Sequence, residues 1–295
     1  MRITVVGQVA RDLVLVVPEV PGKGGSTTVS ERRELLGGKG ANIARNAVQL
    51  GASTALLGVV GDDRQGRLLV EALAADGVGT STVVQRTGTR TALVVDVVCD
   101  GGYRYLEDIP GATLVTTADV EAAATALGAA DAVVLQLQQP GRAALAAARA
   151  TSGLVVLDGV PDDEADALLA RADVLRADHT EAEQLTGRSL DRPEDAVAAG
   201  RELLARGPSV VALEVPGEAN VLVWQGGSAV VPLTDEDVVD TTGGGDAFVA
   251  ALTVALARGD DPGTAGKFAT AASGRAVDHP GGRTDLTGLP RFPHP

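Results

Sequence analysis

The stretch Asp240-Thr241-Thr242-Gly243-Gly244-Gly245-Asp246-Ala247-Phe248 carries the most information about the fold of this chain. An extended, β-branched segment precedes it, and the apolar run 247–257, which contains no helix breaker, follows it. Three consecutive glycines at the start of a helix allow positive φ angles and leave backbone N–H groups without partners. Together with the helix dipole, these N–H groups attract phosphate oxygens. The stretch therefore predicts an anion site at the start of a helix.

Asp246 stands at the edge of this predicted anion site. Its carboxylate can take a proton from a hydroxyl group that attacks a phosphate, which is the role of a general base. A glycine turn followed by an Asp N-cap explains the same residues without any catalytic role. The local chemistry gives the two interpretations equal weight, so the rest of the chain has to decide between them.

Two further glycine motifs lie nearer the N-terminus. They are Gly37-Gly38-Lys39-Gly40-Ala41-Asn42 and Gly58-Val59-Val60-Gly61-Asp62-Asp63-Arg64-Gln65-Gly66. With the 240–248 stretch, they resemble, in the same order, the signatures of the ribokinase-like (PfkB) family of carbohydrate and nucleoside kinases, whose C-terminal signature is usually written D-T-x-G-A-G-D-x-F. Gly244 replaces the middle alanine of that signature and keeps the backbone donors. The resemblance runs from residue 1 to about residue 282, nearly the whole chain.

Strand-like and helix-like segments alternate along the chain, which predicts a mostly parallel sheet flanked by helices. The resemblance implies an α/β fold of the ribokinase type, a three-layer sandwich formed by residues 1–295 as a single kinase domain. Two regions, approximately 13–36 and 90–107, interrupt the alternation with the pattern of exposed strands. We expect them to form a small antiparallel β sheet. The resemblance makes this sheet a lid over the sugar and often a homodimer interface, whereas a peripheral layer without function explains the strands equally well.

The composition is compatible with a large α/β domain. Hydrophobic residues make up 45% of the chain and aromatic residues 2%, so Val, Leu and Ala must fill the core. The 25 Lys and Arg residues against 39 Asp and Glu residues give a net charge of −14, which argues against nucleic acids and anionic membranes as partners. Cys99 is the only cysteine, which excludes an internal disulfide. No apolar run approaches the ~18 residues of a membrane-spanning helix, and the N-terminus lacks the form of a signal peptide, so we expect a cytoplasmic protein.

The resemblance also assigns roles to individual residues around the acceptor. Asp246 would be the general base, and the amides of Gly243, Gly244 and Gly245 would stabilise the phosphoryl group during transfer. The substrate-binding residues would be Asp12, Gly38, Lys39, Asn42 and Gln138. Taken alone, Asp12 is more simply explained as a turn or cap residue.

ATP and Mg²⁺ are the cofactors that the resemblance implies, with K⁺ as a further candidate. The nucleotide-binding residues would be Asp178, Glu181, Glu214, Gly217 and Thr270, and Glu181 would hold Mg²⁺ through water. The monovalent cation would be held by Asp240, Thr242, Val277 and Gly282. Two simpler interpretations remain open: a capping box formed by Thr180 and Glu183, and a turn in which Asp240 bonds to Thr242.

Several positions depart from the family pattern. Ala10 stands where the family often has Asn, and Gln138 stands where a sugar-facing Glu is usual. On the nucleotide side, Glu214 replaces a Thr that would contact phosphate, and Pro216 lacks the N–H group that a glycine would offer. A carboxylate beside ATP phosphates repels them unless a cation lies between.

Two hypotheses follow. The first is an ATP-dependent kinase that transfers the γ-phosphate to a hydroxymethyl group of a small carbohydrate similar to ribose or fructose, or to a nucleoside. The second is a catalytically silent relative that binds a sugar, which the departures at Ala10, Gln138, Glu214 and Pro216 favour. We favour the kinase because Asp246 and its glycines are intact. Few cations are available for a phosphorylated sugar, namely Lys39, Arg11 and Arg104, which favours an unphosphorylated acceptor.

Overall fold

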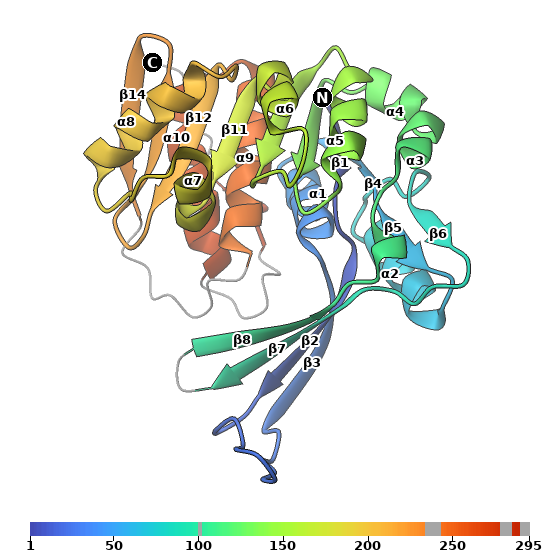
Figure 1. Ribbon diagram of the computed structural model, residues 1–295. Coiled ribbons are helices and arrows are strands. Elements are labelled where there is room, and N and C mark those ends of the chain that lie inside the picture. The colour runs from blue at the N-terminus through green and yellow to red at the C-terminus, as the bar shows by residue number, and fades with distance from the viewer. Residues whose placement is uncertain (100–101, 234–242, 278–284, 290–295) are drawn as a thin grey trace.

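The computed structural model describes residues 1–99, 102–233, 243–277 and 285–289. Eight strands form the main sheet, in the order β14-β13-β12-β11-β10-β9-β1-β4 (Figure 1). Neighbouring strands from β12 to β4 are parallel, and β13 and β14 extend the sheet as an antiparallel hairpin. The strands are β1 (Arg2–Val6), β4 (Ser53–Leu57), β9 (Ala132–Gln136), β10 (Leu154–Asp158), β11 (Val174–Ala177), β12 (Val210–Val215), β13 (Ala219–Trp224) and β14 (Gly227–Pro232).

The central strands are apolar on both faces because helices cover both. Every residue of β9 and of β11 is buried, as expected for strands inside a covered parallel sheet. Alternate side chains enter two separate cores. In β9, Val134 belongs to one core and Val133 to the other.

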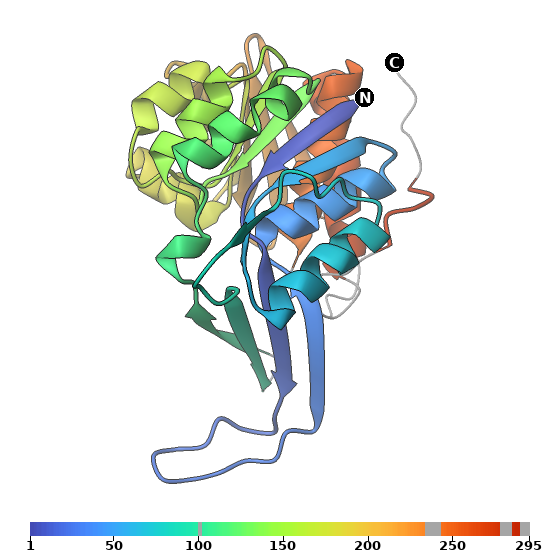
Figure 2. The same ribbon diagram turned by 90° about the vertical axis from the view of Figure 1, so that its right-hand side faces the viewer.

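Ten helices among the described residues complete the three layers, which Figure 2 shows edge-on. One core packs against α1 (Lys39–Gln49), α2 (Arg64–Ala75), α9 (Gly244–Arg258) and α10 (Pro262–Val277). The other packs against α3 (Thr117–Ala122), α4 (Ala124–Gly128), α5 (Gly141–Arg149), α6 (Ala165–Arg171), α7 (His179–Thr186) and α8 (Pro193–Leu204). Helix α9 is buried along most of its length because it lies between the sheet, α1 and α10. Its glycine-rich start is therefore held by packing on several sides.

A second sheet, which we call the lid, projects from one end of the main sheet (Figure 1). Its strands, in the order β3-β2-β7-β8, are β2 (Ala10–Val16), β3 (Glu31–Gly37), β7 (Leu93–Cys99) and β8 (Gly102–Asp108). The expectation of an antiparallel lid is wrong for its central pair, because β2 and β7 are parallel. Helices α1 and α2 lie between β2 and β7 in the chain, so the connection is a crossover and not a hairpin.

Strand β3 also begins late in the predicted lid region of approximately residues 13–36. Pairing with β2 begins only at Glu31, opposite Val16. Pro18, which follows soon after Val16, has no N–H group with which to extend the ladder. Elsewhere the short β5 (Val59–Gly61) follows β4 and pairs with β6 (Val84–Arg86) in a separate two-stranded sheet. Among the described residues, no helix combines the length and the apolar composition needed to cross a membrane.

Candidate active site

A cavity of about 530 Å³ lies between the lid and the carboxyl ends of the strands of the main sheet. The lid contributes residues of β2, β7 and β8, and the starts of α1 and α9 contribute the glycine motifs. The ends of β11 and β12 and the segment after β9 complete the wall. Carboxyl ends of parallel strands are where open α/β sheets bind their ligands. Residue 12 and the motifs 37–42 and 243–246, which carry the family resemblance, thus meet at one cavity.

Asp246 lies in the first turn of α9 and lines this cavity. The N-cap of α9 is Gly243, with φ of 82° and no side-chain cap, so the interpretation of Asp246 as an N-cap is wrong. The side chain is buried, with the residue 7% exposed, and it accepts a hydrogen bond of 2.9 Å from Asn42 Nδ2. Burial raises the pKa of Asp246 to about 6, although the nearby Lys39 and the Asn42 hydrogen bond oppose the rise. A carboxyl with this pKa is suited to act as a base near neutral pH.

Asp12 faces the cavity from the lid strand β2. It pairs across the sheet with Val94, and Val94 pairs with Glu107, so the three side chains form one row on the same face. All three line the cavity. Burial raises the pKa of Asp12 to about 7, and the charges of Asp246 and Asp96 act in the same direction. The lid therefore presents an acidic edge to whatever binds beneath it.

Lys39 begins helix α1 and is positioned by the glycine before it. Gly38 has φ of 89°, and a Cβ at this position would lie 2.7 Å from the carbonyl oxygen of Gln8. Only glycine fits this close approach of two backbone segments. Burial opposes the charge of Lys39, but the carboxylates of Asp158, Glu181 and Asp246 outweigh it and raise the pKa. Lys39 Nζ lies 3.9 Å from Glu181 Oε1.

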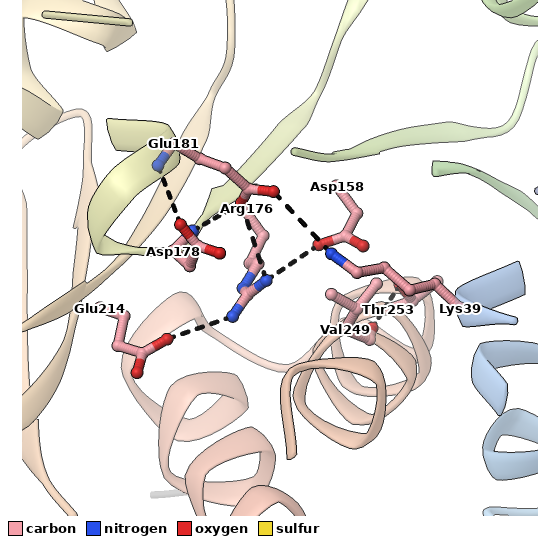
Figure 3. A network of polar contacts seen from close by, with 8 residues as sticks. All are labelled: Lys39, Asp158, Arg176, Asp178, Glu181, Glu214, Val249 and Thr253. Atoms are coloured by element: carbon pink, nitrogen blue, oxygen red, sulfur yellow. Dashed lines mark hydrogen bonds and ion pairs between the residues drawn. The ribbon is translucent and has the colours of Figure 1, made fainter. Parts of the chain in front are cut away.

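Arg176 is the centre of a buried charge network beside the start of α9 (Figure 3). Its Nη1 lies 3.2 Å from Asp158 Oδ1 and 4.0 Å from Glu181 Oε2, and its Nη2 lies 3.3 Å from Glu214 Oε2. Asp158 and Arg176 are direct neighbours in the register of β10 and β11, which explains their contact. Burial opposes the charge of Arg176, but the surrounding carboxylates raise its pKa.

The sequence interpretation did not identify Asp158 or Arg176. Both are charged residues at the ends of neighbouring apolar runs, Leu154–Asp158 and Val174–Ala177. A charge inside a strand that is otherwise apolar must be paired or functional, and that signal was present in the sequence. The Glu214 carboxylate would repel phosphates unless a cation lies beside it, and Arg176 is such a cation.

Helix α7 begins with a capping box, but not the one expected from Thr180 and Glu183. The pair is Asp178 and Glu181, whose side chains each accept a hydrogen bond of 2.8 Å from the other's backbone N–H group. Burial, followed by the charge of Asp158, raises the pKa of Glu181. Asp178 lines the cavity and brings a carboxylate, a ligand type that Mg²⁺ prefers, to its wall, whereas Glu181 is not among the described residues that line the cavity.

Only some of the remaining predicted site residues line the cavity. Gln138, Gly243 and Gly245 line the cavity, whereas Gly244 is buried and is not among the described residues that line it. Gly217 lies in the turn after β12 with φ of 68°, and Thr270 accepts a buried hydrogen bond of 3.2 Å from Asn220 Nδ2. Neither is among the described residues that line the cavity. Val277 ends helix α10, and the other predicted cation ligands, Asp240, Thr242 and Gly282, lie outside the described residues.

Comparison with known proteins identifies the family of this chain. The family model described as pfkB family carbohydrate kinase matches residues 1–288. The ribokinase of Mus musculus is 30% identical over 263 residues, which cover 86% of this chain and 81% of that protein. A nucleoside kinase of Methanothermobacter thermautotrophicus is 26% identical over 292 residues, 95% of this chain and 91% of that one. The chain spans about half, 48%, of a bifunctional ribokinase/ribose-5-phosphate isomerase A of Fructilactobacillus sanfranciscensis, with 29% identity over 257 residues and 85% of this chain covered.

Solved structures give the same result for the fold. The ribokinase of Arabidopsis thaliana, whose structure is a complex with ribose and ATP, superposes with a TM-score of 0.82 at 27% identity, covering 95% of this chain and 93% of that one. The expected ribokinase-like α/β fold with a mostly parallel central sheet is thereby confirmed. The chain belongs to the pfkB family of carbohydrate kinases, which are phosphotransferases that act on an alcohol group.

Proposed function

We propose that this chain is an ATP-dependent kinase that transfers the γ-phosphate to a hydroxymethyl group of a small, unphosphorylated carbohydrate similar to ribose or fructose. One observation carries the proposal: the buried Asp246 carboxylate lies at the uncapped start of α9, in a cavity whose opposite wall carries Asp12. A base, an anion site and a hydroxyl-binding carboxylate are the groups that phosphoryl transfer to a sugar requires.

In this proposal Asp246 takes the proton of the attacking hydroxyl group. The hydroxyl oxygen then forms a bond to the γ-phosphorus, the bond to the bridging oxygen breaks, and ADP leaves. The backbone N–H groups of Gly243, Gly244 and Gly245 stabilise the charge on the transferred group. Asn42, which donates to Asp246, fixes the orientation of the base. A pKa of about 6 leaves Asp246 ionised at neutral pH and basic enough to accept the proton.

Asp178 at the cavity wall and Glu181, its partner in the capping box, are carboxylates of the kind that hard cations prefer, which supports a Mg²⁺ site beside them. When bound with the nucleotide, the ion neutralises phosphate charge. We propose that Glu181 holds it through water and that Asp178 supports it. Asp240, Thr242, Val277 and Gly282 remain the proposed ligands of K⁺.

The acidic row of the lid supports an uncharged acceptor. Asp12 and Glu107 stand at the two ends of the row, with Val94 between them. Carboxylates accept hydrogen bonds from a diol and repel a phosphate group. Of the cations considered for a phosphorylated sugar, Arg11 is paired with Glu34 and Arg104 donates to Cys99 Sγ. A nucleoside acceptor is the second candidate, supported by the similarity to the nucleoside kinase of Methanothermobacter thermautotrophicus.

We propose further that two copies associate through the lid. Leu106 of β8 is 63% exposed, and its cross-strand neighbours on the same face are Val95 and Leu13. Sedimentation equilibrium would test this: a Leu106→Glu variant should be a monomer at concentrations where the wild type is a dimer. A monomeric wild type would refute the proposal of a dimer.

The test of the kinase proposal is ADP release with ATP and Mg²⁺ over a panel of ribose, fructose, 2-keto-3-deoxygluconate, adenosine and ribose 5-phosphate. We expect turnover with at least one unphosphorylated acceptor. A folded sample that binds sugar and releases no ADP with any of them would favour a catalytically silent sugar-binding relative. Preference for adenosine would favour the nucleoside kinase.

A further inference from the structure

The Arg176 guanidinium is buried in the wall of the cavity and faces three carboxylates. Its side chain is 9% exposed, and its partners are Asp158, Glu181 and Glu214. Figure 3 shows the guanidinium between them, with Glu214 on the side opposite Asp158. Two cations, Lys39 and Arg176, thus stand among these carboxylates and Asp246 in the same part of the cavity. A buried guanidinium that faces three carboxylates at a binding cavity points to a role in ligand binding and not only in stability.

The same guanidinium lies against the start of α9. A Cβ placed on Gly245 would lie 2.9 Å from Arg176 Nη2 and 3.2 Å from Nη1, so the backbone and the guanidinium are in direct contact. Gly243 caps α9 without any side chain, which leaves the first N–H groups of the helix available to a ligand. Arg176 and Gly245 both line the cavity. Fixed positive charge and backbone donors therefore face the same space, and an anion there would contact both.

Glu214 is the partner of Arg176 that is easiest to remove. Its side chain is 37% exposed, whereas that of Asp158 is 3% exposed and that of Glu181 is 18% exposed. Glu181 Oε2 is also held because it accepts a capping hydrogen bond from the backbone N–H of Asp178. Moving a half-exposed carboxylate into water costs little desolvation, whereas releasing a buried one requires the protein to open. Asp158 orients the guanidinium, and Glu214 can leave it.

We propose that Arg176 binds a phosphate group of the nucleotide and that Glu214 is the counter-ion which this phosphate displaces. The inference rests on the proposed function, because it takes the ligand to be ATP. A guanidinium matches phosphate with two parallel hydrogen bonds, which an ammonium group cannot reproduce. Glu214 therefore competes with the phosphate for Arg176. This competition explains how a carboxylate can occupy a position beside the phosphate site without blocking nucleotide binding.

The test is isothermal titration calorimetry of ATP with Mg²⁺ in the absence of any acceptor and, in a separate titration, of adenosine. Glu214→Gln should bind ATP roughly 3- to 10-fold more tightly, because a competing charge is removed. Arg176→Lys should bind ATP about 10-fold more weakly or worse, because one of two charge-assisted hydrogen bonds is lost. Neither change should alter the affinity for adenosine, which has no phosphate. Glu202→Gln is the matched control, since Glu202 pairs with Arg188 on the surface of α8 at 3.2 Å.

Unchanged or weaker binding of ATP to Glu214→Gln would overturn the inference; weaker binding would mean that Glu214 holds the metal. Unchanged ATP affinity of a folded Arg176→Lys would overturn it as well. The Glu214 measurement stands by itself if Arg176→Lys fails to fold, because Glu214 is the exposed partner. A wild type that binds no ATP would refute the proposed function itself, whereas a wild type that binds ATP with unchanged variants refutes only the roles of Arg176 and Glu214.

Discussion

Replacing Asp246 by Asn separates the catalytic role of this residue from its role in stability. Asn keeps the shape of the side chain and still accepts the hydrogen bond from Asn42 Nδ2, so the cavity should not change. It cannot accept a proton at neutral pH. Loss of a general base lowers the rate by about 10²- to 10⁴-fold, so kcat should fall by that factor while KM for the acceptor stays nearly unchanged.

The same change should stabilise the protein at pH 8. The pKa of Asp246 is about 6 in the folded chain against 3.8 for an ordinary Asp, because burial disfavours the charge. Between these values the unfolded chain loses its proton first, so stability falls as the pH rises from 3.8 to 6 and then stays low. At ~1.4 kcal/mol for each pH unit between the two values, the charged carboxyl costs about 3 kcal/mol at pH 8. The Asp246→Asn variant avoids this cost, because its side-chain amide carries no charge.

Urea unfolding at pH 4, 6 and 8 measures the effect. The stability difference between Asp246→Asn and the wild type should be small at pH 4 and should approach about 3 kcal/mol at pH 8. Asp119→Asn is the control: Asp119 is equally buried, but hydrogen bonds from Arg86 and Thr116 outweigh burial and lower its pKa. That variant should lose stability and keep its activity. A variant at Asp246 that is less stable than the wild type at pH 8, or that retains full turnover, would refute the reasoning.

Three further changes test the surroundings of the base. Gly37→Ala should raise KM for the acceptor and leave ATP binding unchanged, because a Cβ at this position would collide with the Asp12 carboxyl. Equal effects of the change on KM for the acceptor and for ATP in steady-state kinetics would count against the role of Asp12. Asp158→Asn should lower the free energy of unfolding by ~3 kcal/mol in urea titrations, because it leaves the buried Arg176 without its nearest charged partner. An unchanged midpoint of unfolding would show that the Asp158–Arg176 pair contributes nothing to stability. Glu107→Gln should raise kcat/KM for ribose 5-phosphate relative to ribose roughly threefold to tenfold, and an unchanged ratio would show that the lid does not select by charge.

Much of the main sheet could be predicted from the sequence, because its strands and helices have clear boundaries. The strand Leu154–Asp158 and the helix Pro262–Val277 belong to the predicted alternation of strands and helices. The apolar strand ends at Asp158 and the helix begins at Pro262, and both are residues whose backbone preferences mark boundaries. The lid was less predictable. Its central pair joins β2 to β7 across α1 and α2, and nothing local in either strand specifies a partner so distant or its parallel direction.

The residues of the candidate site were likewise only partly predictable from the sequence. Lys39, Asn42 and Asp246 were recognised because each lies in a short motif, and Asp12 because of the family resemblance; the structure brings all four to one cavity. Arg176 could not be recognised from a motif. Its position follows from the register between β10 and β11 and from contact with the start of α9, both of which are tertiary. The capping box was assigned to the wrong pair because Thr180 and Glu183 satisfy the same spacing as Asp178 and Glu181.

Asp246, which lines the cavity, is proposed to remove the proton of a bound alcohol while the γ-phosphoryl group is transferred to the alcohol oxygen. The most direct measurement follows label from γ-³²P-ATP into the acceptor under single-turnover conditions, in parallel for the wild type and Asp246→Asn, from pH 5 to 8. We expect labelled sugar phosphate from the wild type, with a rate that rises with pH up to about the pKa near 6 of Asp246, and at least about 100-fold slower transfer by the variant, without the rise that Asp246 causes. Equal rates of label transfer from the two proteins would contradict the claim.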